Sequence, residues 1–111
     1  MQRLTSEFWV QAYMRRLQLN DISAYLTRRG DATAGAVVVK LATLDGNAIA
    51  HHRILDFETG ARRWEILAQG PEFEVDESLR RSAARDPDLW LIEIEDRHGR
   101  TLLDEEGLAQ S

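Results

Sequence analysis

The sequence predicts an α+β fold, a single domain with a mostly antiparallel sheet of five to six strands and two helices on one face, in the order α-β-β-β-β-α-β. Three observations predict this fold. A helical period opens the chain, several strand-like segments then follow consecutively, and a second helical stretch precedes a final strand. The length of 111 residues suits one domain over residues 1–111, with its core at 6–103 and an acidic tail at 104–111.

The first predicted element is a helix over about residues 6–19. Val10, Tyr13, Met14 and Leu17 recur at the spacing i, i+3, i+4 and i+7, which places them on one apolar face. A hydroxyl side chain at position 5 or 6 is suited to cap this helix, because its oxygen can accept a hydrogen bond from a free N–H of the first turn.

The middle of the chain predicts an antiparallel meander. Its four strand-like segments are residues 22–29, 36–44, 48–57 and 62–68. The second segment contains three consecutive valines, which is typical of a strand buried on both faces. Asp45–Gly46 is a strong hairpin signal between the second and third segments, and residues 58–60 supply the next turn. We therefore expect each of these strands to pair with the next.

The last third of the chain predicts one helix and one strand. Gly70–Pro71 interrupts the pattern, and Asp76 is placed to cap a helix that ends near Arg85, before Asp86–Pro87. Residues 89–95 then alternate between two faces, with Trp90, Ile92 and Ile94 on one and Leu89, Leu91, Glu93 and Glu95 on the other, as expected of a strand. Residues 101–103 are expected to add a short edge strand.

Composition excludes several classes of function. The chain has 14 basic and 19 acidic residues, a net charge of −5. This balance argues against nucleic acids and membrane surfaces as partners, because proteins that bind them usually have a net positive charge. It has no cysteine, so disulfides, iron–sulfur clusters and a cysteine nucleophile are excluded. No segment is apolar enough to span a membrane or to act as a signal peptide, so we expect a cytoplasmic protein. We expect no cofactor.

Charge is divided unevenly along the chain. Residues 1–70 carry 9 basic and 7 acidic residues, whereas residues 71–111 carry 5 basic and 12 acidic residues. An electrostatic contact between the two parts, within or between copies, is therefore a specific hypothesis.

Several short motifs together resemble a known family. They are Trp9–Val10, Arg15–Arg16, Arg28–Arg29–Gly30–Asp31, Gly35–Ala36–Val37, Val39–Lys40–Leu41, and the run from Asp86 through Arg97 to Gly99–Arg100. They make the chain similar to the Domain of Unknown Function 1491 family, small proteins found mainly in alphaproteobacteria, over roughly residues 8–104. The resemblance implies one compact domain, and it carries no activity or site residues.

Arginine dominates the basic residues, because Lys40 is the one lysine among the 14. Guanidinium groups bind phosphate at two points, and Gly-rich turns can present backbone N–H groups to an anion. One hypothesis is therefore a ligand site at Arg28, Arg29, Gly30 and Gly35, which would bind a phosphorylated small molecule or RNA. The alternative is a plain loop, with the Arg pairs on solvated faces bridging carboxylates.

Glu93 and Glu95 share one face of the last predicted strand and are candidate metal ligands. With Asp96 and either His51 or His52 they would support a metal-assisted hydrolase. The alternative is a charged outer face opposite the apolar side of the strand.

No catalytic triad or nucleophile motif occurs in the sequence. Three tryptophans and strands that are apolar on nearly both sides, in so small a domain, favour completion of the core by a partner. The leading hypothesis is therefore a non-enzymatic interaction module that self-associates, with a homodimer as the expected assembly.

Overall fold

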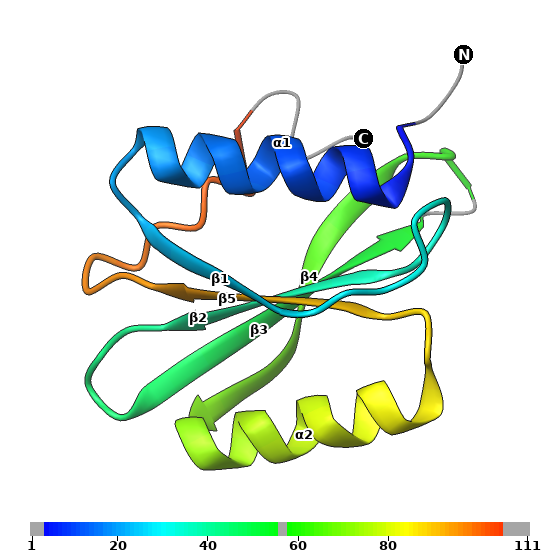
Figure 1. Cartoon of the computed structure of the whole chain (residues 1–111). Coiled ribbons are helices and arrows are strands. Elements are labelled where there is room, and N and C mark those ends of the chain that lie inside the picture. Colours follow the sequence, from blue (N-terminus) through cyan, green and yellow to red (C-terminus); the bar gives the residue numbers. More distant parts are fainter. Residues whose placement is uncertain (1–3, 56–57, 106–111) are drawn as a thin grey trace.

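A computed structural model describes residues 4–55 and 58–105, and it has a five-stranded sheet with one helix on each face (Figure 1). In chain order the elements are α1 (Ser6–Leu19), β1 (Ser23–Arg28), β2 (Val37–Ala42), β3 (Asn47–Leu55), β4 (Arg62–Pro71), α2 (Glu72–Arg85) and β5 (Trp90–Glu95). The predicted α+β class and the order of the elements are confirmed. The expected strand end at residues 56–57 and the tail residues 106–111 lie outside the described part of the chain.

The strands lie in the order β1-β5-β2-β3-β4, so the predicted meander is only partly correct. β2, β3 and β4 pair antiparallel in sequence, as expected, but β1 pairs antiparallel with β5 instead of with β2. β5 also runs parallel to β2, from Val37 opposite Trp90 to Ala42 opposite Glu95. Because the connection between β1 and β2 is longer than a tight hairpin turn, a later strand can lie between them.

The prediction that both helices lie on one face is wrong, since α1 and α2 cover opposite faces (Figure 1). All six residues of the central strand β2 are buried, so both of its faces need a cover. The core beneath α1 consists of Trp9, Val10, Tyr13, Leu17, Ile22, Val37, Val39, Leu41, Trp90, Ile92, Ile94 and Leu103. The core against α2 consists of Val38, Ala48, Ala50, Val75, Leu79 and Leu89.

The helix starts differ in how well the sequence predicted them. Thr5 caps α1 as expected, because its Oγ1 accepts a hydrogen bond from the N–H of Phe8 at 3.2 Å. α2 begins at Glu72, four residues before the predicted cap at Asp76. β4 continues through Pro71 directly into α2, and the Glu72 N–H donates to the Gly46 carbonyl at 2.9 Å. α2 can start this early because the N–H of Glu72 already has an acceptor and the ring of Pro71 fixes its φ.

Residues 101–103 do not form the expected edge strand, and the chain turns at Leu103 and Asp104. They pack beneath α1 instead, where the Tyr13 hydroxyl donates to the Thr101 carbonyl at 2.7 Å and Leu103 is buried. In the described ranges, no helix combines the length and the apolar character that crossing a bilayer requires.

Candidate functional site

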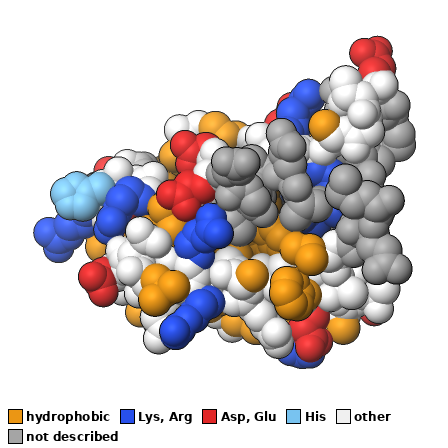
Figure 2. Space-filling model, turned by 90° about the horizontal axis from the view of Figure 1, so that it is seen from above, with side chains coloured by type: hydrophobic (Ala, Val, Ile, Leu, Met, Phe, Trp, Pro, Cys, Tyr) orange, Lys and Arg blue, Asp and Glu red, His pale blue; other side chains and the backbone are white. Residues whose placement is uncertain are grey.

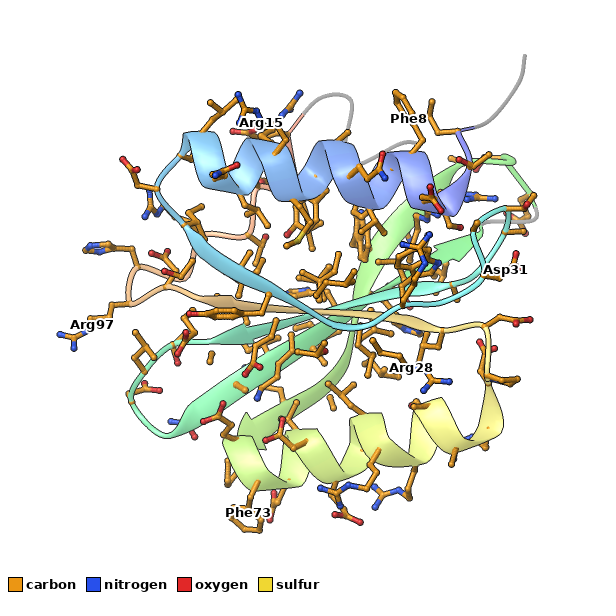
Figure 3. The ribbon with its side chains drawn as sticks, viewed as in Figure 1. Phe8, Arg15, Arg28, Asp31, Phe73 and Arg97 are labelled. Carbon is orange, nitrogen blue, oxygen red and sulfur yellow. The ribbon has the colours of Figure 1, made fainter. Side chains whose placement is uncertain are left out.

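Arg28 is held by backbone carbonyls at the start of β5. Its Nε donates to the Leu89 carbonyl and its Nη2 to the Pro87 carbonyl, each at 3.1 Å. Figure 3 shows Arg28 on the α2 side of the sheet. These two hydrogen bonds join the end of β1 to the segment between α2 and β5, and they give the guanidinium a structural role.

Arg29 lies on the opposite face, against α1. Its Nη2 donates to the carboxylate of Glu7 in the first turn of the helix, and its guanidinium carbon lies 5.2 Å from the Trp90 ring centroid. The two neighbouring arginines therefore do not meet at one ligand, which agrees with the alternation of side chains along a strand.

Gly30 and Gly35 are positions of close approach. A Cβ atom built on either one would lie 2.2 Å from the Asp88 carbonyl oxygen, so only glycine fits beside that backbone. The loop between these two glycines also provides hydrogen-bond acceptors for its own backbone N–H groups. Thr33 and Ala34 donate to the Asp31 carboxylate, and the Asp31 N–H donates to the Asp88 carbonyl.

The same loop holds the N-terminus of α1. The backbone N–H groups of Ser6 and Glu7 donate to the carbonyls of Thr33 and Ala32. N–H groups in the first turn of a helix have no acceptor within the helix, so the loop satisfies donors that would otherwise need water or a ligand. The geometry fits a structural loop, and ligand binding by Arg28, Arg29, Gly30 and Gly35 stays a prediction.

Lys40 is the centre of a charged cluster on the α2 side of the sheet. Its side chain is only 7% exposed, and its Nζ contacts carboxylates of Glu72 at 2.7 Å, Asp76 at 2.6 Å and Glu93 at 2.8 Å. Burial alone would lower the pKa of Lys40, but hydrogen bonds to Asp76, Glu72 and Glu93 outweigh it and raise that pKa above its usual value. One protonated lysine therefore joins β2, β5 and α2.

The Lys40 cluster determines what the two predicted metal ligands contact. Glu93 forms an ion pair with the ammonium group of Lys40. Glu95 lies beside the hydroxyl of Tyr25, and the hydrogen bond to Glu95 and the negative charge of Glu95 raise the pKa of Tyr25. In residues 4–55 and 58–105, no three His, Asp or Glu side chains are arranged to hold a metal ion. The metal site at Glu93 and Glu95 stays a prediction.

A polar cleft of about 570 Å³ lies beside this cluster, between α2 and the strands β1 and β5. Its lining residues are Thr27, Lys40, Glu72, Asp76, Leu79, Arg80, Leu91, Ile92 and Glu93. The carboxylates of Glu72, Asp76 and Glu93 in this cleft already contact Lys40. The cleft is therefore the outer surface of the ion-pair cluster that joins α2 to the sheet.

A groove of about 700 Å³ lies between α1 and the edge strand β1. Its apolar lining consists of Val10, Met14, Ile22, Ala24, Leu26 and Trp90, and Glu7, Arg15 and Arg29 are among its charged residues. Figure 2 looks down on this side of the molecule, where hydrophobic side chains are interspersed with basic and acidic ones. A mixed surface of this kind is typical of protein interfaces that form between separately folded chains.

β1 borders this groove and is an edge strand of the sheet. Tyr25 is 51% exposed and Leu26 is 42% exposed, on neighbouring positions of the strand. The strand thus presents backbone groups on its outer edge together with two large exposed side chains, a combination suited to pairing with another strand.

The fold and these surfaces define a small α+β domain with a mixed sheet covered by one helix on each face. A family model described as "Protein of unknown function (DUF1491)" matches residues 4–104, so the chain belongs to the DUF1491 family. The resemblance found in the sequence is confirmed. No curated protein matches the chain.

Solved structures support this assignment. A crystal structure of a DUF1491 family protein from Caulobacter crescentus CB15 is 38% identical with a TM-score of 0.84, covering 93% of this chain and 97% of that one. An NMR structure of a DUF1491 family protein from the same organism is 37% identical with a TM-score of 0.82, covering 95% and 96%. A solution structure of an A. tumefaciens protein is 29% identical with a TM-score of 0.71, covering 85% and 86%.

Sequence reasoning missed the Lys40 cluster, although a signal for it was present. Lys40 is the one lysine of the chain and lies next to three valines in a strand predicted to be buried. A buried lysine needs carboxylate partners. The identity of those partners depends on the placement of α2 over the sheet, which the local pattern did not contain.

Proposed function

We propose that this protein is a non-enzymatic, cytoplasmic interaction module that pairs with a second copy of itself along β1. The observation that carries the proposal is the edge strand β1, with exposed Tyr25 and Leu26 beside the groove between α1 and β1. The lack of cysteine suits the cytoplasm, because small secreted domains commonly depend on disulfides.

Charge at the two ends of β1 supports a second copy as the partner. Exposed Asp21 precedes the strand, and Arg28 with exposed Arg29 ends it. Two copies of one strand related by a two-fold axis run antiparallel, so the acidic start of each strand lies beside the basic end of the other. The complementary contact then occurs twice in one interface.

Strand pairing also explains how exposed apolar side chains become covered. A strand added to β1 would bring its own Leu26 next to the groove between α1 and β1, where Met14 and Ala24 are half-buried. Burial of apolar surface stabilises such an association, and the backbone hydrogen bonds fix its register.

Sedimentation velocity over a concentration series tests this proposal. We expect the wild-type chain to form dimers at high concentration and Leu26→Lys to remain monomeric, because each copy would then have to bury a charge beside the apolar lining of the groove. Phe73→Lys is the matched control, since Phe73 is 72% exposed and points away from the sheet on the outer side of α2 (Figure 3).

Two outcomes would contradict the proposal. A wild-type chain that stays monomeric at the highest concentration it tolerates would remove self-association altogether. A dimer that Leu26→Lys leaves intact, or that Phe73→Lys disrupts equally, would remove β1 as its location. Far-ultraviolet circular dichroism of each variant shows that the fold is kept.

A further inference from the structure

The groove between α1 and β1 has a continuous apolar floor. Ile22, Ala24 and Leu26 are alternate residues, so their side chains share one face of the chain, and they line the groove from the strand side. Val10 and Met14 lie one turn apart on α1 and line it from the helix side. The groove therefore presents an elongated apolar surface between two secondary-structure elements.

This floor is only partly covered by the protein itself. Val10 and Ile22 are buried, Met14 and Ala24 are half-buried, and Leu26 is 42% exposed. A ligand that replaces water on this surface is stabilised in proportion to the apolar area that it covers. The volume of about 700 Å³ lies in the range typical of small-molecule sites.

The two ends of the groove differ in charge. At one end Arg29 is paired with Glu7 and lies against the Trp90 ring, so its charge is compensated. At the other end Arg15 contacts the neutral amide of Gln18 at 3.4 Å, and no carboxylate pairs with it within residues 4–55 and 58–105. Figure 3 shows Arg15 on the outer side of α1, near the end of the helix that leads into β1. The rim of the groove thus has a cation without an anionic partner at this end.

The length of the groove fits a chain-like ligand. An α-helix rises about 1.5 Å per residue, so Glu7 and Gln18 at the two ends lie about 16 Å apart along α1. The floor between them is apolar on both sides. A long apolar floor with a cation at one end matches a molecule that has an alkyl chain and one anionic end.

We infer that this groove binds a free single-chain carboxylate, with its alkyl chain on the apolar floor and its carboxylate beside Arg15. A guanidinium group can donate two hydrogen bonds to a carboxylate, which fixes the orientation of the chain. All lining residues belong to one chain and lie on the α1 side of β1, whereas strand pairing uses the outer backbone edge of β1. The binding of this ligand therefore does not require self-association.

Methyl signals in a ¹³C–¹H correlation spectrum test the inference. The probe is decanoate at pH 7, below the concentration at which it forms micelles, with the protein dilute enough to sediment as a monomer. We expect shifts of Met14, Ile22 and Leu26, which line the groove. The signals of Val75 and Leu79 should stay in place, because these residues belong to the core on the opposite face of the sheet.

Ligands that differ in chain length and charge separate the two parts of the recognition. Affinity should rise by about two- to fourfold for each methylene group from octanoate to dodecanoate, because each one removes more apolar surface from water. Decyltrimethylammonium has the same chain length as decanoate but a positive charge, and it should bind more weakly than decanoate.

Matched variants locate the two ends of the ligand. Arg15→Gln should weaken binding of decanoate by about threefold and leave binding of decanol unchanged, whereas Arg15→Lys should keep most of the affinity. Met14→Gln places an amide on the floor and should weaken both ligands by about tenfold. Arg97→Gln is the control for the loss of one charge, because Arg97 lies in the turn after β5, away from the groove (Figure 3).

Four results would overturn the inference. They are the absence of methyl shifts at millimolar decanoate, equal shifts on both faces of the sheet, an affinity independent of chain length, and equal affinities for decanoate in Arg15→Gln and Arg97→Gln. Binding to phosphatidylglycerol vesicles without binding of decanoate would also overturn it, because the surface would then contact a bilayer and not a free molecule. None of these results bears on the pairing of β1, which sedimentation of Leu26→Lys tests separately.

Discussion

Replacing Lys40 with methionine tests whether the buried lysine holds α2 against the sheet. Methionine has a similar length and fills the same space, so the variant removes the charge without opening a cavity. Glu72, Asp76 and Glu93 then face one another with no cation between them, where wild-type Nζ contacts lie between 2.6 and 2.8 Å. The domain should therefore be less stable.

The magnitude follows from the exposure of the partners. The lysine side chain is 7% exposed, but the three carboxylates are 41%, 44% and 29% exposed, so water can replace part of what they lose. At about 1 kcal/mol for each charge-assisted hydrogen bond after this discount, Lys40→Met should cost about 3 kcal/mol. That value is at the low end for breaking a buried ion pair.

Urea unfolding at pH 7, followed by tryptophan fluorescence, measures this loss. With a urea dependence of about 1.5 kcal/mol/M for a domain of this size, the midpoint should fall by about 2 M. The double variant Lys40→Met with Glu93→Gln should recover about 1 kcal/mol, because it removes one of three mutually repelling charges. Arg97→Gln, in an exposed turn, is the control and should leave the midpoint unchanged.

The pH dependence has a definite sign. The pKa of Lys40 is higher in the folded than in the unfolded chain, so its contribution is complete below the ordinary lysine pKa of about 10.4. The contribution is lost as the pH rises through the folded-state pKa. The difference between wild type and Lys40→Met should thus be constant from pH 7 to pH 10 and shrink above that.

A variant as stable as the wild type would refute this reasoning. It would mean that the free-energy cost of desolvating the lysine equals the stabilisation that its three carboxylate contacts provide. A double variant less stable than Lys40→Met alone would refute the part of the argument that depends on repulsion among the carboxylates.

Three further predictions concern other parts of the structure. Gly30→Ala should lower the thermal midpoint more than Gly60→Ala. A Cβ at position 30 would lie 2.2 Å from the Asp88 carbonyl oxygen, whereas at position 60 it meets nothing within 4 Å and the loss comes only from the positive φ of 74°; equal losses would contradict this. Asp96→Asn should be less stable than wild type at pH 7, and this difference should shrink as the pH falls below about 3.9. Hydrogen bonds from Arg100 lower the pKa of Asp96, so its contribution is present above the ordinary value of about 3.9 and lost as the pH falls through the folded-state pKa. A difference in urea midpoint that does not shrink as the pH is lowered from 5 towards 2 would refute it. Tyr13→Phe should cost about 1–2 kcal/mol in urea unfolding, because a backbone carbonyl loses its donor at 2.7 Å, and a neutral effect would show that water replaces it.

Local patterns predicted the elements well and their arrangement less well. The period of Val10, Tyr13 and Leu17 identified α1, because the side chains that create the pattern are those that are buried. The start of α2 was missed because Gly70–Pro71 is a helix breaker in most contexts. Here Pro71 ends an edge strand and precedes the helix, where its missing N–H has no cost.

The arrangement depends on contacts between distant residues. Trp90 lies opposite Val37 and Ile94 opposite Ala24, pairs that no local period can specify. The three consecutive valines of β2 also indicate where the helices lie, because a strand that is apolar on both faces must be covered on both sides. The candidate sites were predicted on loops and strand faces that the structure uses internally, as Arg28 and its carbonyl partners show.

The central position of β5 has a consequence for how the chain acquires its structure during synthesis. β5 is the last strand in sequence, yet it lies between β1 and β2 and pairs with both. Until residues 90–95 have left the ribosome, β1 has no neighbour in the sheet and the largest core lacks Trp90, Ile92 and Ile94. The domain therefore folds after translation of nearly its whole length, and nascent chains that stop before β5 should be substrates for chaperones and proteases.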